Sequence, residues 1–198
     1  MKRILIMTAV DAEKEAVEKG IGTNPNIQVE TAGVGPASAA ARTAICLAKD
    51  DYDLVINAGI GGGFKERAEI LEVVISSDIV CADLGAETAD SFIPVEELGF
   101  GSSRIESPQI MQTMKSGVII TKSTVTGTDD TALDLLERFP EAVAEGMEGF
   151  GVASAAKEYG VPVVEIRAIS NFVGKRDRGA WKIPEALEQL AKAMEVLR

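Results

Sequence analysis

The sequence predicts a single-domain α/β fold, with three α/β/α layers and a central sheet that is mixed but mainly parallel. The 198 residues suit one compact domain. Segments with strand and helix character alternate along the chain, which is typical of a sheet packed between helices. No linker, internal repeat or low-complexity segment interrupts this alternation. We therefore expect residues 1–198 to form one domain.

The first half of the chain begins with a continuous apolar run, residues 4–9, which predicts a buried strand. Further strands are expected over residues 27–31, 53–57, 70–75 and 79–82, and helices over residues 11–19 and 37–49. Pro36 marks the start of the second helix, since proline is favoured in a first helical turn. The glycines that follow the strand at 53–57 are expected to form a loop at the strand exit.

The second half opens with a long polar excursion, residues 83–115, which contains Pro94 and Pro108 and suggests one helical turn at 110–114. Loops of this length are often functional. Three strands are then expected, over residues 117–121, 142–147 and 161–169. Helices are expected over residues 129–139, 150–159 and 184–197, and the last of these has a clear apolar face.

Composition argues for a small-molecule partner. Twenty Lys and Arg stand against 31 Asp and Glu, a net charge of −11, which disfavours binding to nucleic acid or to an anionic membrane. No apolar run approaches the roughly 20 residues of a membrane span. The basic N-terminus is followed by an apolar run but by no small-residue cleavage site, so we expect a cytoplasmic protein whose first strand is buried.

The sequence contains no histidine. This removes the Ser-His-Asp and Cys-His arrangements and the commonest metal ligand. The two cysteines, Cys46 and Cys81, have no metal-ligand spacing and are expected to be small buried apolar groups. Catalysis must therefore rest on carboxylates, and we expect no metal and no organic cofactor.

Candidate site residues follow predicted strands, where ligands bind in parallel α/β sheets. Gly59, Ile60 and Gly61 lie in a segment with four glycines, which lets backbone N–H groups approach a ligand or simply forms a flexible turn. A pair of glycines at 33 and 35 lacks the third glycine of a dinucleotide fingerprint, so nicotinamide binding is not expected.

Two glutamates are candidates for the chemistry. Glu148 stands between glycines at a strand exit, where it could accept hydrogen bonds from the vicinal hydroxyls of a ribose, or could only stabilise a helix N-terminus. Glu13 lies in the first turn after the first strand, a position where acidic residues also occur for reasons of helix stability alone.

The last strand leads into further polar candidates. Asn171 follows the strand and offers both a donor and an acceptor, although a turn asparagine can serve only its own backbone. Arg167 and residues 175–178 form a mixed cluster that could meet an acidic substrate tail or be a solvated loop. Trp181 could be a core residue, a dimer contact or a stacking surface.

Four ordered motifs together resemble those of the purine nucleoside phosphorylase/nucleosidase superfamily across nearly the whole chain. They are the acidic turn after the first strand, the segment 57–62 (Asn-Ala-Gly-Ile-Gly-Gly), the segment 146–149 (Gly-Met-Glu-Gly) and the segment 167–171 (Arg-Ala-Ile-Ser-Asn). The resemblance to the methylthioadenosine/S-adenosylhomocysteine nucleosidases implies that Glu13 activates water, that Met147 and Glu148 bind ribose, and that Asn171 engages the base. It also implies a homodimer or a larger homo-oligomer.

Asn171 replaces the aspartate of those adenine-directed enzymes. An amide can donate to a 6-oxo group and accept from a protonated N7, so the pocket is expected to prefer a 6-oxopurine. Residues 170–174 (Ser-Asn-Phe-Val-Gly), with Trp181, look like the sequence of the futalosine hydrolases, a branch of the superfamily. This resemblance implies hydrolysis of futalosine to hypoxanthine and dehypoxanthinyl futalosine in menaquinone biosynthesis.

The implied mechanism passes through an oxocarbenium-like ribosyl transition state. Asn171 and the backbone around Val125 and Thr126 would stabilise the departing base, while Met147 and Phe172 would pack against sugar and purine. Three alternatives remain open: a phosphorylase, an adenine nucleosidase, and a nucleoside-sensing module without turnover. Released base distinguishes an enzyme from the module, and ribose 1-phosphate would identify the phosphorylase.

Overall fold

The computed structural model describes residues 3–111 and 113–198. The strands are β1 (Ile4–Thr8), β2 (Ile27–Thr31), β3 (Leu54–Gly63), β4 (Val73–Cys81), β5 (Gly85–Glu87), β6 (Phe92–Pro94), β7 (Arg104–Glu106), β8 (Lys115–Thr121), β9 (Ala142–Gly146) and β10 (Val163–Phe172). The α-helices are α1 (Asp11–Ile21), α2 (Pro36–Leu47), α3 (Asp129–Arg138), α4 (Gly149–Glu158) and α5 (Ile183–Met194), with short 3-10 helices at Arg178–Ala180 and Glu195–Leu197. The expected alternation of strands and helices is confirmed. The turn expected at 110–114 contains Gln112, which lies outside the described residues.

The main sheet is mixed, as expected, but it closes on itself. Its strand order is β10-β4-β8-β9-β3-β1-β2, and β10 also pairs with β3. Strands β3, β10, β4, β8 and β9 therefore form a barrel-like ring, from which β1 and β2 extend in parallel. The three-layer arrangement is not confirmed, because strands that return antiparallel, such as β4 against β10, close part of the sheet into this ring.

Strand β3 is longer than the sequence suggested. The expected glycine loop is the second half of the strand, which pairs with β10 as far as Gly63. Glycine inside a strand allows a tight bend and a close approach of neighbouring groups. The run from Gly59 to Gly63 thus carries β3 from the flat part of the sheet into the barrel, and the site is built around it.

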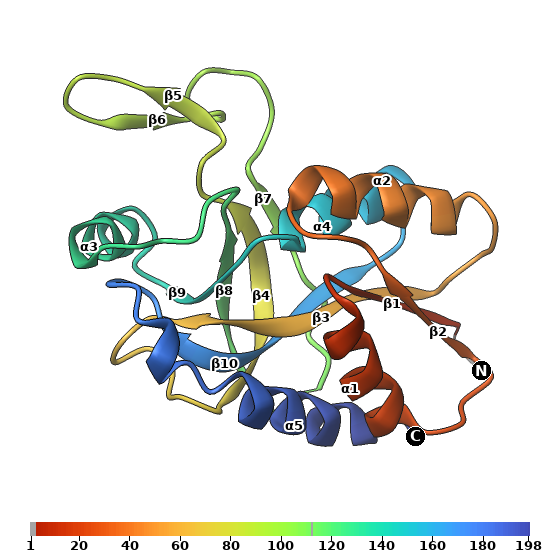
Figure 1. Cartoon of the computed structure of the whole chain (residues 1–198). Coiled ribbons are helices and arrows are strands. Elements are labelled where there is room, and N and C mark those ends of the chain that lie inside the picture. Colours follow the sequence, from red (N-terminus) through yellow and green to blue (C-terminus); the bar gives the residue numbers. More distant parts are fainter. Residues whose placement is uncertain (1–2, 112) are drawn as a thin grey trace.

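Helices cover the sheet in two pairs. In Figure 1, α2 and α4 lie side by side above the strands, and α1 and α5 lie together below them. The alternation of β1 matches this arrangement, since Leu5 and Met7 are buried with the α2–α4 side and Ile6 with the α1–α5 side. In the part of the chain that the structure describes, no helix combines the length and the apolar character needed to cross a bilayer.

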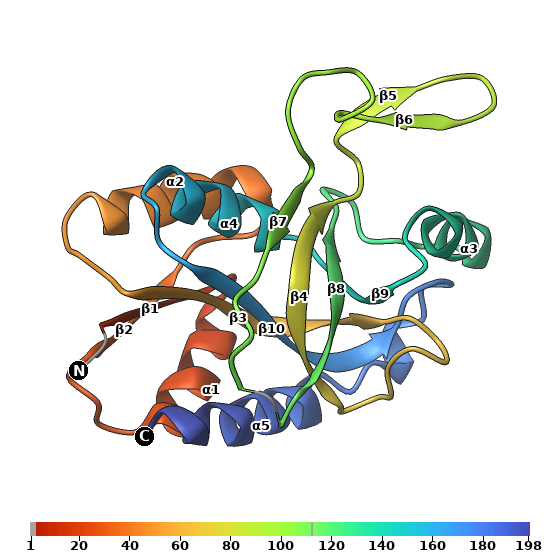
Figure 2. The same ribbon diagram turned by 180° about the vertical axis from the view of Figure 1, so that it is seen from behind.

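The polar excursion contains β-structure. The two strands expected at 70–75 and 79–82 are one strand, β4, which begins only at Val73 and ends at Cys81. Its pairing with β8 shifts register between Ser76 and Asp78. After β4 the chain forms a hairpin of β5 and β6, which stands away from the barrel in both views (Figures 1 and 2), and it returns as β7 along β4.

Candidate active site

A cavity of about 190 Å³ opens where β3, β9 and β10 meet the start of α1. It is lined by Ala9, Val10, Glu13, Val34, Ile60, Gly61, Gly62, Val125, Thr126, Glu145, Gly146, Met147, Glu148, Arg167, Ser170, Asn171, Val173 and Trp181. Most of this lining is apolar, and its polar side chains are three carboxylates, one guanidinium, one amide, two hydroxyls and one indole. Such a combination is typical of a site for a small organic ligand.

Glu13 is buried at the third position of α1, and backbone donors fix its carboxylate. One oxygen accepts hydrogen bonds from the N–H groups of Ala9 (2.8 Å) and Val10 (3.3 Å), and the other accepts from Ile60 (2.9 Å). Val10 is the N-cap residue of α1, so this bond ties the carboxylate to the start of its own helix and fixes the side chain there. Burial raises the pKa of Glu13, while Arg167 and the backbone donors offset part of that rise.

Glu148 immediately precedes α4 but makes no capping bond to that helix. One of its oxygens accepts from the N–H of Gly35 at 3.1 Å, and the other lies 3.2 Å from Nη2 of Arg167. Its hydrogen bonds therefore do not support the alternative role, in which its charge would only stabilise the start of α4. They connect the loop before α2 to β10 instead. The carboxylate is 3% exposed and faces the same cavity as Glu13.

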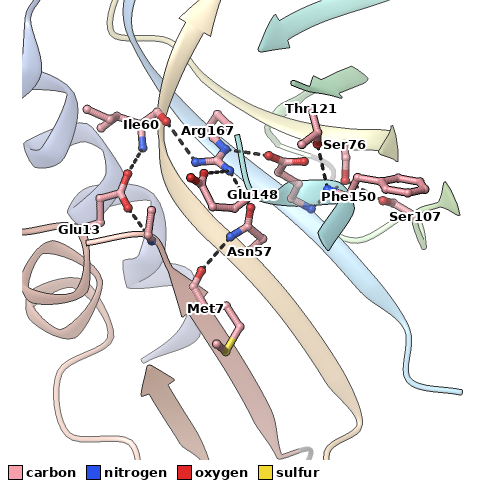
Figure 3. Close-up of polar contacts among 12 residues, drawn as sticks. Met7, Glu13, Asn57, Ile60, Ser76, Ser107, Thr121, Glu148, Phe150 and Arg167 are labelled. Carbon is pink, nitrogen blue, oxygen red and sulfur yellow. Dashed lines mark hydrogen bonds and ion pairs between the residues drawn. The ribbon is translucent and has the colours of Figure 1, made fainter. Parts of the chain in front are cut away.

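Arg167 is the buried cation of the site (Figure 3). Its guanidinium donates to the carbonyl of Ile60 (3.2 Å), to Oδ1 of Asn57 (2.7 Å), to Glu148 and to Glu165. Burial acts to lower its pKa, but the carboxylates of Glu165, Glu148 and Glu13 outweigh that effect and raise it. Arg167 is thus held as a cation, apart from the exposed residues 175–178 with which the sequence grouped it.

Glu165 lies two residues before Arg167 on the same face of β10. Its Oε1 accepts from Nε of Arg167 at 2.8 Å, while its Oε2 is buried without a hydrogen-bond partner. Burial raises the pKa of Glu165 to about 7, although Arg167 lowers it. Two carboxylates, Glu148 and Glu165, are therefore paired with one guanidinium, and Glu13 lies near enough to interact with the same charge.

Asn171 reaches the cavity through a bulge in β10. The pairing of β10 with β3 shifts register between Ile169 and Asn171, and such a bulge redirects the side chains beside it. Ser170 Oγ donates to Oδ1 of Asn171 (2.9 Å), and Nδ2 of Asn171 donates to the carbonyl of Phe172 (3.0 Å). Both bonds are local, and the side chain still lines the cavity.

Eight of the ten residues expected at the site line this cavity: Glu13, Ile60, Gly61, Val125, Thr126, Met147, Glu148 and Asn171. Gly59 and Phe172 do not. A Cβ on Gly59 would lie 2.5 Å from Oε1 of Glu13 and 2.6 Å from Nη1 of Arg167, so Gly59 supports the site from behind. Phe172 approaches it only through the carbonyl that binds Asn171.

Some cavity residues were not expected from the sequence. Glu145 and Val34 line it. Ser170, which belongs to the motif at 167–171, and Trp181, for which a stacking surface was one of three alternatives, also line it, and Asn57 and Glu165 bind Arg167 from behind. The alternation of Glu165 and Arg167 within an apolar strand was a usable signal, because charged residues at positions i and i+2 share one face. The groups that bind Arg167 and Glu165 come from segments far apart in the sequence, so the sequence alone did not reveal this hydrogen-bond network.

Comparison with known proteins agrees with this architecture. The family model of the phosphorylase superfamily matches residues 15–198. The futalosine hydrolase of Streptomyces coelicolor is 47% identical, over 96% of this chain and 93% of the relative, and that of Acidothermus cellulolyticus is 44% identical, over 98% and 89%. The structure of the 5'-methylthioadenosine/S-adenosylhomocysteine nucleosidase of Helicobacter pylori superimposes with a TM-score of 0.84, at 18% identity, over 100% of this chain and 97% of that one. The chain therefore belongs to the phosphorylase superfamily and, within it, to the family of the futalosine hydrolases.

Proposed function

We propose that this protein hydrolyses the N-glycosidic bond of futalosine and releases hypoxanthine and dehypoxanthinyl futalosine, a step of menaquinone biosynthesis. The single observation that carries the proposal is the convergence of Glu13, Glu148 and Asn171, from three distant segments, on one cavity. Two relatives, at 47% and 44% identity, bear the name of that activity. The three side chains supply a base, a ribose acceptor and a purine contact.

Glu13 activates the water in this proposal. Its carboxylate is held by three backbone N–H groups, so its geometry is fixed before substrate binds. Burial, which raises its pKa, strengthens it as a base, and the proton of the water moves to one of its oxygens as the water attacks C1'. Arg167 stays a cation and offsets the charge of the surrounding carboxylates.

Glu148 holds the ribose. An ionised carboxylate has about four acceptor positions. Among the described residues, Gly35 and Arg167 use two of these positions, which leaves positions for two vicinal hydroxyls. Its negative charge also stabilises the positive charge that develops on the sugar in the transition state. Met147 lines the same part of the cavity and packs against the ring.

Asn171 and the backbone of Val125 and Thr126 bind the leaving base. The amide of Asn171 can turn to donate to O6 of hypoxanthine and to accept from N7–H. The proton on N7 comes from solvent water as the C1'–N9 bond breaks and its electron pair moves to the base. A site that pairs specific polar groups rejects a ligand that lacks them, because its own groups are then left buried and unpaired. This supports a 6-oxopurine over adenine.

Two rival activities make different products. A methylthioadenosine-type nucleosidase would release adenine from 5'-methylthioadenosine in preference to hypoxanthine from futalosine. A phosphorylase would need a phosphate site, yet Arg167 is the one cation among the described residues of the cavity lining, and its donors already bind protein groups. Mixing the protein with futalosine, inosine and 5'-methylthioadenosine and separating the released bases by chromatography tests the proposal. We expect hypoxanthine from futalosine at the highest rate, and adenine as the main product would overturn it.

The proposal also covers the contact with the far end of the substrate, the oligomeric state and the cellular location of the enzyme. Arg176 lies 5.8 Å over the ring of Trp181, which lines the cavity, so a cation is available for the aromatic carboxylate at the far end of futalosine. We further propose that the enzyme is cytoplasmic and forms a homodimer or a larger homo-oligomer. Support comes from a groove over α2 and α4, lined by Ala41, Ala44 and the exposed Leu84 and Tyr159. Light scattering after size exclusion measures the oligomeric state.

A further inference from the structure

Glu145 is a buried carboxylate of the cavity that the proposed mechanism does not use. It is 6% exposed, lines the cavity, and forms no ion pair within the described part of the chain. Its Oε1 accepts from the backbone N–H of Thr126 at 2.9 Å, and its Oε2 accepts from the hydroxyl of Thr126 at 2.5 Å. Lys122 donates to that same hydroxyl at 3.1 Å, which orients the O–H of Thr126 towards Glu145.

Gly62 separates Glu145 from Asn171. In the sheet, Gly62 pairs with Glu145 of β9 on one side and with Asn171 of β10 on the other. Residues at matching positions of neighbouring strands point to the same face, and two strand spacings amount to about 10 Å. Glu145 and Asn171 therefore face the cavity from both sides of a residue that has no side chain. The gap suits a flat ring held between two polar groups.

We propose that Glu145 accepts a hydrogen bond from N1–H of a 6-oxopurine and that, together with Asn171, it determines which purine base the site prefers. This inference rests on the proposed function. Hypoxanthine carries a hydrogen on N1, and adenine carries a lone pair there. Glu145 has acceptor positions beyond the two that Thr126 occupies. It attracts N1–H of the oxo base and repels the N1 lone pair of the amino base. Asn171 contacts O6 and N7, so the two residues bind neighbouring positions on either side of the O6 corner of the base.

The test compares futalosine with its 6-amino analogue in the wild type and in Glu145→Gln. The substituted side chain keeps an acceptor for Thr126 but presents an N–H that can donate to N1 of the amino base. A hydrogen bond to a charged group supports a change on the order of 10-fold to 100-fold. We expect the ratio of kcat/KM for the oxo over the amino substrate to fall by that factor. Glu188→Gln, an exposed change of the same kind on α5, should leave the ratio unchanged.

An unchanged ratio, or an equal loss with both substrates, would overturn the inference and leave Glu145 as a support for Thr126. A second measurement needs no variant: product inhibition of the wild type by hypoxanthine and by 1-methylhypoxanthine, which has no N1–H. We expect the methylated base to inhibit at least about 10-fold more weakly, and equal inhibition would contradict the inference. If the wild type releases no base from either nucleoside, it is the proposed function that fails.

Discussion

Glu13 and Arg167 bind opposite backbone groups of the same residue: Glu13 accepts from the N–H of Ile60 at 2.9 Å, and Arg167 donates to its carbonyl at 3.2 Å (Figure 3). The carboxylate that we propose as the base and the buried cation are therefore fixed relative to each other by a strand of the barrel. Gly59, directly before Ile60, has no Cβ, and both charged groups pack against it. Displacing either group displaces the other.

Gly59→Ala should damage activity more than folding. The new Cβ would lie 2.5 Å from Oε1 of Glu13 and 2.6 Å from Nη1 of Arg167, so both groups must move. A displacement of about 1 Å in a catalytic site costs on the order of 100-fold in rate, and overpacking costs about 1–3 kcal/mol of stability. We expect kcat to fall by that factor in a protein that still unfolds cooperatively. Gly179→Ala, where the nearest atom is 3.4 Å away, is the matched control, and wild-type kcat in Gly59→Ala would refute the coupling.

Glu13→Gln should lose turnover and keep ligand binding. Removing a general base costs about 10²-fold to 10⁴-fold in rate, and Glu148 and Asn171 still hold ribose and base. The measurements are kcat by release of hypoxanthine and Kd for futalosine by calorimetry. Glu15→Gln, exposed on the same helix, should behave as the wild type. A parallel loss of binding and turnover would show that Glu13 holds the ligand instead of activating water.

Asn171→Asp should shift preference towards 6-aminopurines only in part. The aspartate oxygen that replaces Nδ2 would face the carbonyl of Phe172, now 3.0 Å from that nitrogen, so a protonated carboxyl is favoured there. Such a carboxyl suits N7 of adenine. Glu145 would still repel the N1 lone pair, so the double variant with Glu145→Gln should shift further than either single variant. Competition between futalosine and its 6-amino analogue measures this, and unaltered discrimination in all three variants would exclude the purine-edge account.

Glu165 should make stability depend on pH. Its pKa is raised by burial from 4.5 to about 7 in the folded protein, so the folded state binds its proton more tightly than the unfolded state does. The stabilisation is fully present below pH 4.5 and is lost as the pH rises towards 7, by a few kcal/mol. Glu165→Gln removes this titration. Urea unfolding at about pH 5 and about pH 8, on either side of the folded pKa, should show that the wild type loses more stability across this range than the variant. Equal losses of stability in the wild type and in Glu165→Gln would contradict the assignment of this pH dependence to Glu165.

The sequence predicted the alternation of strands and helices, and eight of the ten site residues expected from it line the cavity, since strand exits and glycine patterns are local signals. It missed the closure of the barrel, because the pairing of β10 with both β3 and β4 is a long-range property. The segment from Gly59 to Gly63 was expected to form a loop because its pairing with β10 is also a long-range property. A glycine run suits a turn until a partner strand and the guanidinium of Arg167 are known to pack against it.

The burial of Arg167 was also hidden from the sequence. Arginine is seldom fully buried unless it is paired. Its partners Asn57, Glu148 and Ile60 come from segments that only the fold brings together. Its neighbour in sequence, Glu165, was the one visible clue.

Product identification for the wild type and Glu13→Gln, each incubated with futalosine in phosphate buffer, tests the central claim most directly. Mass spectrometry and phosphorus NMR separate the possible sugar products. Hydrolysis through a water activated by Glu13 predicts equal amounts of hypoxanthine and dehypoxanthinyl futalosine from the wild type and almost none from the variant. A 1-phosphorylated sugar, or undiminished release of hypoxanthine by Glu13→Gln, would contradict it.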